Sequence, residues 1–257
     1  MPILMVSLTD TKLMSSPSPP LRPVSMPLHR QLRDLLMARI EAGEWSPGTY
    51  LPPETRLADD YGVAVGTLRK ALLDMAAEGV VVRRQGKGTV VASHDSDAVL
   101  FRFFNLRRPD GATLHPESRV LSRLRRRATA PEAASLGLPT GPDVICITRV
   151  READGTPFIY EHILLGAQRF GALEHAPELL PNTLYQLYQT DFGATVHRAR
   201  EQVTAASASG GCAAELDLPA DTPLLHIRRI ALDYNDTPIE LRLSWVNTES
   251  LYYQTEV

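Results

Sequence analysis

The chain lacks several features that would define other classes of protein. None of its 257 residues lies in an apolar run of about 18, so no membrane-spanning helix is expected. Residues 1–25 have no basic start, long apolar core or small-residue cleavage site, which argues against an export signal. The two cysteines, Cys146 and Cys212, lie far apart and without clustered histidines, which predicts no disulfide or zinc site. We expect a cytoplasmic protein without metal or cofactor.

Charge is unevenly distributed along the chain. Residues 1–127 hold 19 Lys and Arg against 13 Asp and Glu, a net charge of +6, whereas residues 128–257 hold 8 against 17, a net charge of −9. This difference indicates either a polyanion-binding first half or a solvated charged surface.

The first segments of the chain are a tail and a helix. Residues 15–25 read SSPSPPLRPVS, a composition that buries too little apolar surface to fold, so residues 1–25 are predicted to be disordered. An amphipathic helix follows from Met26, and Gly43 suits the left-handed position just past its end. The predicted inward positions are Leu28, Leu32, Leu35, Leu36 and Ile40.

Two short helices and a hairpin come next. The first helix follows Leu51-Pro52-Pro53 and stops at Gly62, and the second covers about Val65 to Ala77. Such a pair with a tight glycine turn predicts a helix-turn-helix. Residues 80–91 alternate as a hairpin with a basic, glycine-containing bend. Residues 26–93 are therefore predicted to form a winged helix-turn-helix domain.

The remainder reads as a linker at residues 94–116 and an α+β domain at residues 117–257. An internal repeat supports the second domain. Residues 133–139, AASLGLP, match residues 213–219, AAELDLP, and a turn sequence ending in Thr-Pro recurs at an offset of 81. Each copy reads as a helical turn, a strand, a tight turn and a returning strand, which predicts a largely antiparallel sheet.

The winged-helix segment suggests DNA contacts. The N-terminal side chains of the third helix can meet base edges in the major groove, while cations on the preceding helix and the wing can bind phosphates or the minor groove. The alternative for each residue is a solvated surface position. The candidate DNA-binding residues are Arg56, Thr67, Arg69, Lys70, Arg83, Arg84, Gln85, Gly86, Lys87 and Gly88.

Short motifs run through residues 26–92 in a fixed order. They are Pro27-Leu28, Gln31-Leu32, Gly43, Pro47-Gly48, Leu51-Pro52, Glu54, Leu57-Ala58, Gly62-Val63, Thr67 to Leu72, Glu78-Gly79 and Arg84 to Val91. With them the segment resembles, without a gap, the GntR family of bacterial transcription regulators. That resemblance implies a homodimer that binds a two-fold double-stranded DNA operator, with repression as the default outcome.

The segment departs from the family pattern at two places. The family usually has Pro-Ser-Glu-Arg where this chain has residues 52–55, PPET, so Arg56 lies one place after the usual arginine. It usually has Ser-Arg-Thr-Thr at residues 64–67, which here read AVGT. Ala64 forfeits a side-chain cap worth about 1 kcal/mol, and Val65 cannot make a phosphate or base contact. The preferred operator is therefore expected to differ from the commonest ones.

A second set of motifs lies in the C-terminal domain. They are Ser118 to Leu121, Leu136-Gly137-Leu138, Arg149-Val150-Arg151, Asp154 to Pro157, Tyr160-Glu161, Thr183-Leu184-Tyr185 and Thr237 to Glu240. This domain resembles the UTRA effector-binding domain of the HutC subfamily, whose fold is similar to chorismate lyase. The resemblance implies a small, often anionic effector such as a sugar phosphate or carboxylate. By the family pattern, Thr183 stands where a hydroxyl often meets the effector and Trp245 where an aromatic residue is common.

The strand pattern agrees in part with such a site. Arg149 and Arg151 share a strand face with two isoleucines, so an apolar face becomes cationic, as an anion pocket requires. Glu161 lies on an apolar face, where it could pair with an arginine or accept hydrogen bonds from ligand hydroxyls. Plain solvation of the strand end is the alternative. The candidate effector-binding residues are Arg149, Arg151, Glu161, Thr183, Arg242 and Trp245.

The sequence does not determine the register of the hairpin that carries Arg149 and Glu161. A two-residue turn at Asp154-Gly155 would place Arg149 opposite Tyr160, whereas one additional loop residue would place it opposite Glu161.

Three functional hypotheses remain. The leading one is a ligand-responsive, homodimeric DNA-binding regulator. The second is a constitutive DNA-binding dimer without an effector. The third is an enzyme of chorismate-lyase-like fold, although the sequence has no nucleophile elbow, phosphate-cradling loop or metal-binding histidine pair.

Overall fold

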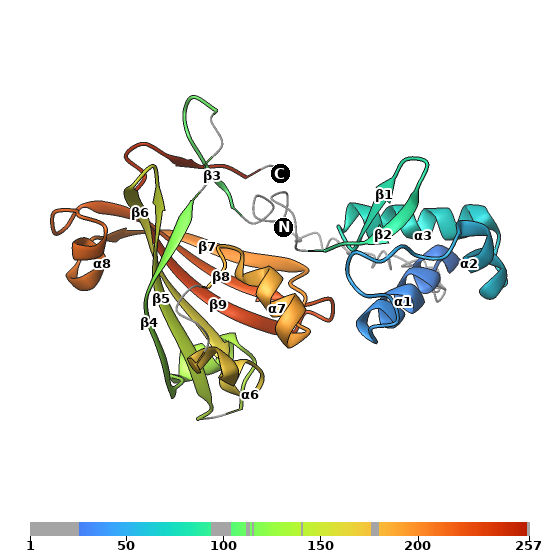
Figure 1. Ribbon diagram of the computed structural model, residues 1–257, viewed down its shortest axis with the longest axis horizontal. Helices are drawn as coiled ribbons and strands as arrows, with labels where there is room; N and C mark the ends of the chain where they lie inside the picture. The colour runs from blue at the N-terminus through green and yellow to red at the C-terminus, as the bar shows by residue number, and fades with distance from the viewer. Residues whose placement is uncertain are drawn as a thin grey trace, which may run out of the picture.

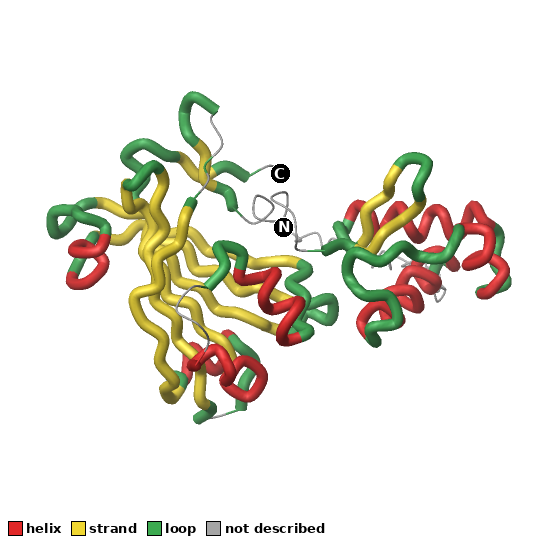
Figure 2. The backbone as a smooth tube through the Cα atoms, viewed as in Figure 1, coloured by secondary structure: helices red, strands yellow, loops and turns green. Residues whose placement is uncertain are grey.

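The computed structural model describes residues 26–93, 104–111, 114, 116–139, 141–175 and 180–255. The predicted disordered tail and most of the predicted linker lie outside these residues. The described chain forms a small helical domain with a hairpin and a larger domain built on one sheet (Figures 1 and 2). None of its helices combines the length and the apolarity that crossing a membrane requires.

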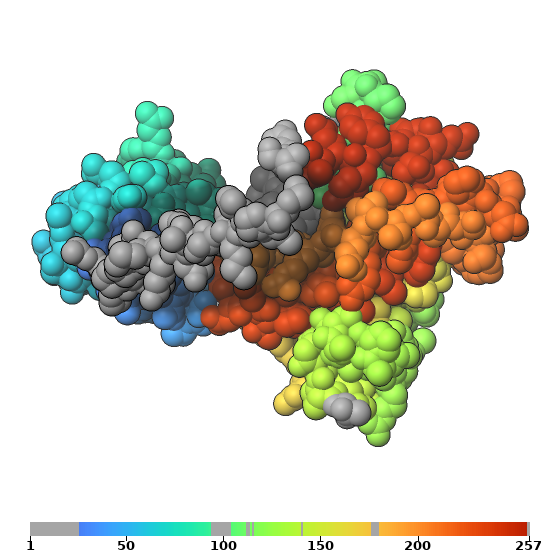
Figure 3. Space-filling model, turned by 180° about the vertical axis from the view of Figure 1, so that it is seen from behind, coloured from blue at the N-terminus to red at the C-terminus, as the bar shows by residue number. Residues whose placement is uncertain are grey.

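The first domain is a winged helix-turn-helix, as predicted. Its elements are α1 (Leu28–Glu41), α2 (Glu54–Asp60), α3 (Val65–Ala77), β1 (Val81–Arg84) and β2 (Gly88–Val91). The two strands pair antiparallel from Val81 opposite Val91 to Arg84 opposite Gly88, and residues 82–88 are exposed. Gly86 at the bend has a φ of 71°, which a side chain would strain. The hairpin projects from the domain surface (Figure 3).

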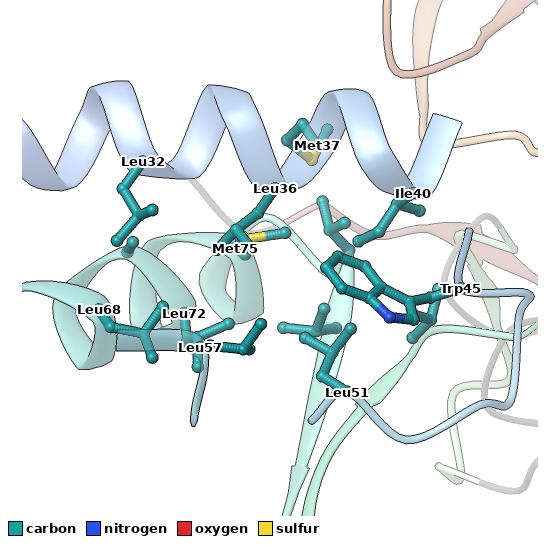
Figure 4. Close-up of a cluster of buried hydrophobic side chains, with 14 of the residues drawn as sticks. Leu32, Leu36, Met37, Ile40, Trp45, Leu51, Leu57, Leu68, Leu72 and Met75 are labelled. Atoms are coloured by element: carbon teal, nitrogen blue, oxygen red, sulfur yellow. The ribbon is translucent and has the colours of Figure 1, made fainter. Parts of the chain in front are cut away.

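The core of this domain lies between α1, α2, α3 and the hairpin (Figure 4). Leu36, Leu57, Leu68 and Met75 are fully buried there. The prediction for α1 was wrong at two positions, because Leu28 and Leu35 are each 54% exposed. The buried stripe runs through Leu32, Leu36, Met37 and Ile40. Each residue turns the helix by about 100°, so the burial of Met37 shifts the centre of the buried stripe away from the two exposed leucines.

The second domain is built on a six-stranded antiparallel sheet in the order β4-β5-β6-β9-β8-β7. The strands are β4 (Glu117–Arg127), β5 (Asp143–Ala153), β6 (Thr156–Gly166), β7 (Arg198–Ser207), β8 (Pro223–Leu232) and β9 (Pro238–Val246). The helices are α5 (Ala130–Ser135), α6 (Ala167–Phe170), the 3-10 helix η1 (Gly171–His175), α7 (Leu184–Phe192) and α8 (Gly210–Glu215). The α+β prediction is confirmed.

The internal repeat corresponds to the two halves of this sheet. The series β4, α5, β5 and β6 is matched by β7, α8, β8 and β9, and the halves join where β6 pairs with β9. The structural repeat is thus longer than the predicted one, since each copy also begins with an edge strand. Both halves carry a bulge in the returning strand, at Phe158 and at Ile239, which are again 81 residues apart.

Part of the predicted linker belongs to the second domain. β3 (Leu106–Arg107) pairs with β10 (Tyr252–Tyr253) in a short antiparallel ribbon. Phe104, Leu106 and Leu114 are buried in one hydrophobic cluster with Phe158. A two-residue strand carries no readable alternation, and its partner lies about 145 residues later, so the sequence pattern could not reveal the pairing.

Candidate DNA-binding surface and ligand-binding site

The start of α3 and the wing are joined by a carboxylate of α2. Glu54 Oε2 accepts a hydrogen bond from Arg69 Nε at 3.0 Å, and Glu54 Oε1 accepts one from Arg83 Nη2 at 3.1 Å. Arg69 lies on α3 and Arg83 on β1, so two of the predicted DNA-binding cations come from separate elements but share one partner. The groove beside them is lined by the start of α2, Leu72 and the wing residues from Arg83 to Thr89.

The other predicted DNA-binding positions lie on the same three elements. Thr67 is half-buried in the first turn of α3, and Arg56 and Lys70 are exposed on α2 and α3. The predicted wing residues, Arg83 to Gly88, are all exposed. Ala64 is the N-cap of α3 and has no side-chain cap hydrogen bond, as its residue type dictates. Helix α3 therefore has backbone N–H groups at its start that no N-cap side chain satisfies.

A buried ion pair lies at the centre of the second domain's sheet. Arg149 on β5 is directly opposite Glu161 on β6, and its Nε donates to Glu161 Oε2 at 2.6 Å. The two residues are 2% and 3% exposed. Burial alone would raise the pKa of Glu161, but Arg149, Arg242 and Arg151 outweigh it and hold the pKa well below its usual range. Glu161 is therefore a carboxylate at neutral pH.

The hairpin reaches this register by a route that the sequence interpretation had not weighed. Asp154 and Gly155 both have positive φ, and Ala153 pairs with Thr156, so the turn has two residues. The bulge at Phe158 then adds one residue to β6 and shifts the pairing. Arg149 is consequently opposite Glu161 and not Tyr160.

A second carboxylate anchors Arg242. Glu240 is fully buried and accepts two hydrogen bonds from Arg242, at 2.9 and 2.8 Å. It also accepts hydrogen bonds from two hydroxyls of α7, Tyr185 at 3.2 Å and Tyr188 at 2.7 Å. Arg242 Nη1 lies 3.7 Å from Glu161, which links the two carboxylates. Helix α7 is thereby tied to the face of the sheet that carries Arg149.

Arg151 differs from these arginines because it has no carboxylate of its own. It is 3% exposed, and its Nε and Nη2, like Arg149 Nη1, have no hydrogen-bond partner among the described residues. Burial lowers the pKa of Arg151 to about 9, with further repulsion from Arg149. Its guanidinium lies 5.0 Å from the centroid of the Phe104 ring. The site therefore combines Arg149, Arg151 and Arg242 with two carboxylates, an excess of one positive charge.

A cavity of about 690 Å³ lies against β4, the strand that pairs with the strand of Arg149 and Arg151. It is lined by β4 residues that include Ser118, Val120 and Arg123, together with Glu174 and Leu180. Ser118 and Val120 pair directly with Arg151 and Arg149, so their side chains share the same face of the sheet. The arginines themselves do not line the cavity. Its volume is in the range of small-molecule sites.

The side chains of two predicted effector residues make no hydrogen bond with the described ion cluster. Thr183 is the half-buried N-cap of α7, two residues before Tyr185. Trp245 follows Ser244 on β9 and so points to the opposite face of the sheet. There its ring packs against Tyr160, His162 and His226, at centroid distances of 5.0 to 5.9 Å. The structure brings Arg149, Arg151, Glu161 and Arg242 together, but not Trp245.

Several members of this site were not among the predicted effector-binding residues. Tyr188, Glu240 and Ser244 complete its hydrogen bonds, and Ser244 Oγ donates to Glu161 at 3.3 Å. Arg229, the repeat counterpart of Arg149, pairs with Glu201, which also binds Tyr253 and Asn105. The alternation of Glu240 and Ser244 with Arg242 predicts a polar strand face, which could be a ligand contact or plain surface. The tyrosines come from a helix whose packing the sequence does not specify.

Fold and site together define a DNA-binding regulator with a second domain built to hold a small molecule. Comparison with known proteins agrees. The family model described as bacterial regulatory proteins, gntR family, matches residues 28–91, and the UTRA domain model matches residues 111–251. The chain belongs to the GntR family of bacterial regulators, in the group that carries a UTRA domain. It is a ligand-responsive transcription regulator and not an enzyme.

Two relatives extend over most of this chain, and a third is a ligand-binding domain alone. An HTH-type transcriptional repressor of Salmonella typhimurium is 29% identical over 87% of this chain and 93% of its own length. The structure of PhnF from Mycobacterium smegmatis is 25% identical, covers 88% of this chain and 98% of that one, and has a TM-score of 0.53. The ligand-binding domain of a GntR-family protein from Bordetella bronchiseptica is 30% identical, covers 61% and 98%, and has a TM-score of 0.56.

Proposed function

We propose that this protein is a cytoplasmic, homodimeric repressor whose affinity for a two-fold DNA operator is lowered by a small anion bound beside Arg149 and Arg151. The proposal is supported above all by Arg151, a buried cation with two guanidinium nitrogens that lack a partner among the described residues. An unpaired buried charge costs several kcal/mol, about what an anionic ligand could recover by pairing with it.

The proposed ligand carries a phosphate or carboxylate group and hydroxyls. The anionic group pairs with the free nitrogens of Arg151 and Arg149, since guanidinium groups bind such anions through paired hydrogen bonds. The hydroxyls meet Ser118 and the oxygens of Glu161. Thr183, at the start of α7, is the proposed contact from the helix side. A sugar phosphate satisfies all of these groups, whereas a plain dicarboxylate leaves Glu161 without a donor from the ligand.

The DNA contacts are proposed for the exposed cations of α2, α3 and the wing. Arg69 and Lys70 lie in the helix that enters the major groove, while Arg56, Arg84 and Lys87 are placed for phosphates or the minor groove. Gln85, Gly86 and Gly88 let the wing backbone approach the duplex. The effector weakens binding only by as much as it prefers the arrangement that does not fit the operator.

A thermal-shift screen against sugar phosphates, carboxylates, amino-acid catabolites and phosphonates tests the ligand. A true effector at about 100 times its Kd stabilises the fold by about 2.7 kcal/mol. The shift disappears in Arg151→Met, which removes the unpaired charge but keeps most of the side-chain volume. Arg125→Met, on the exposed part of β4, keeps it. A shift that survives in Arg151→Met contradicts the proposed site, and no shift with any compound favours the constitutive dimer.

A further inference from the structure

Glu54 is the one acidic side chain that contacts two of the proposed DNA-binding arginines in the described structure. Its carboxylate lies between Arg69 of α3, at 3.0 Å, and Arg83 of β1, at 3.1 Å. The Glu54 side chain is 23% exposed, whereas those of Arg69 and Arg83 are 54% and 42% exposed. The arginines thus extend toward solvent from a carboxylate that sits behind them.

The backbone around Glu54 fixes where this carboxylate lies. Pro53 is the N-cap of α2, with φ −51° and ψ 142°, so Glu54 is the first residue of the helix. Two residues before Pro53, the Leu51 N–H donates to Thr89 O at 2.8 Å, which ties the start of α2 to strand β2 of the wing. Three elements meet here, and each proline has a restricted φ. Glu54 therefore has a defined position relative to both α3 and the wing.

We infer that Glu54 is a positioning residue that sets the wing relative to the recognition helix and so makes DNA binding more selective. Each guanidinium has five N–H donors, so one carboxylate can orient Arg69 and Arg83 and still leave donors for phosphates or bases. The same negative charge repels phosphates, which lowers affinity for any duplex. The inference rests on the proposed DNA-binding role of the two arginines.

Two substitutions distinguish the effect of the negative charge of Glu54 from the effect of its side-chain length. Glu54→Gln keeps the size but removes the charge. If the loss of this negative charge lets one more phosphate be neutralised, the salt dependence of log K steepens by about 0.9, which tightens binding to a non-specific duplex by about fivefold at about 0.15 M salt. Glu54→Asp keeps the charge but is one methylene shorter, so it cannot bridge both arginines. We expect it to leave non-specific affinity unchanged. Both variants should lose selectivity.

The experiment uses the full chain and two duplexes of equal composition. One is selected by the wild-type protein from a random pool, and the other is its scrambled version; their Kd ratio across a salt series gives the selectivity. The matched control is Glu78→Gln, because Glu78 is also bound by an arginine of this domain, Arg33, at 2.6 to 3.1 Å, but it caps the far end of α3. Circular dichroism confirms that each variant is folded.

Loss of selectivity by threefold or more in either Glu54 variant, and not in Glu78→Gln, supports the inference. A loss of selectivity of less than threefold in both Glu54 variants, or an equal loss in the control, overturns it. Arg69→Ala and Arg83→Ala test the proposed DNA-binding role of the two arginines independently of the positioning role of Glu54. If they weaken DNA binding while the Glu54 variants keep selectivity, only the positioning role fails. If they have no effect on DNA binding, the proposed surface itself is wrong.

Discussion

The guanidinium of Arg151 faces the ring of Phe104, 5.0 Å from its centroid, and this contact joins β5 to the first described residues after the winged-helix domain. Phe104 lies two residues before β3, and its ring also meets Phe158 edge-on at 6.5 Å. A ring is a weak partner for a buried cation compared with a carboxylate. An anion that pairs with Arg151 therefore acts on a residue in direct contact with the segment leading to the DNA-binding domain.

A double-mutant cycle measures this contact. Phe104→Leu and Arg151→Met each remove one partner while keeping apolar volume, and the coupling energy should be about 0.5–2 kcal/mol, the usual range for a desolvated cation–π pair. Urea unfolding of the four proteins without ligand gives the value. A coupling energy indistinguishable from zero means that Phe104 only fills space.

Removing the buried carboxylate of Glu161 should give a pH-dependent loss of stability. Because the folded-state pKa of Glu161 lies below its unfolded value of 4.5, its ionisation contributes stability above about pH 4.5, which is lost as the pH falls through the folded pKa. Glu161→Gln should therefore lower the free energy of unfolding by about 3–5 kcal/mol at pH 7, because it leaves the buried Arg149 without its carboxylate partner. The loss should be smaller at acidic pH. Urea unfolding at several pH values tests this, and a pH-independent difference would falsify it.

The two tyrosines that bind Glu240 should differ in importance. Tyr188 is fully buried and its hydroxyl donates at 2.7 Å, whereas Tyr185 donates at 3.2 Å. Tyr188→Phe should cost about 1–3 kcal/mol, the range for a lost hydrogen bond to a buried charged group, and Tyr185→Phe should cost less. The two free energies of unfolding are compared in urea. A larger loss for Tyr185→Phe would contradict the hydrogen-bond geometry.

The N-cap of α3 can be improved. Ala64 has extended backbone dihedrals, φ −64° and ψ 141°, and no side-chain cap hydrogen bond. Ala64→Ser should raise the free energy of unfolding by about 0.5–1 kcal/mol, because a serine hydroxyl can accept from an N–H of the first turn. Thr129→Ala, which removes the capping box of α5, is the reciprocal control and should lower it by about 1 kcal/mol. Thermal unfolding of both variants gives the comparison.

The local elements followed from the sequence, whereas the site depended on long-range pairing. Helix α3 was predicted within its observed bounds, because a glycine turn precedes it and Gly79 follows its end. The register that pairs Arg149 with Glu161 came from a bulge at Phe158, an apolar residue among apolar neighbours that gives no sequence signal. The contact of Phe104 with Arg151 and the hydrogen bonds of Tyr188 to Glu240 join segments about 50 residues apart, which periodicity cannot align.

Lys87 at the wing tip provides a test of phosphate contact that needs no knowledge of the operator. It is exposed, in the turn between β1 and β2. If Lys87 neutralises one phosphate, Lys87→Ala should make the slope of log K against log salt shallower by about 0.9 and weaken binding to specific and scrambled duplexes alike. Arg125→Ala, an exposed cation on β4 of the second domain, should leave the slope unchanged. An unchanged slope in Lys87→Ala would mean that the wing tip does not meet the DNA backbone, and the proposed surface would then be restricted to α2 and α3.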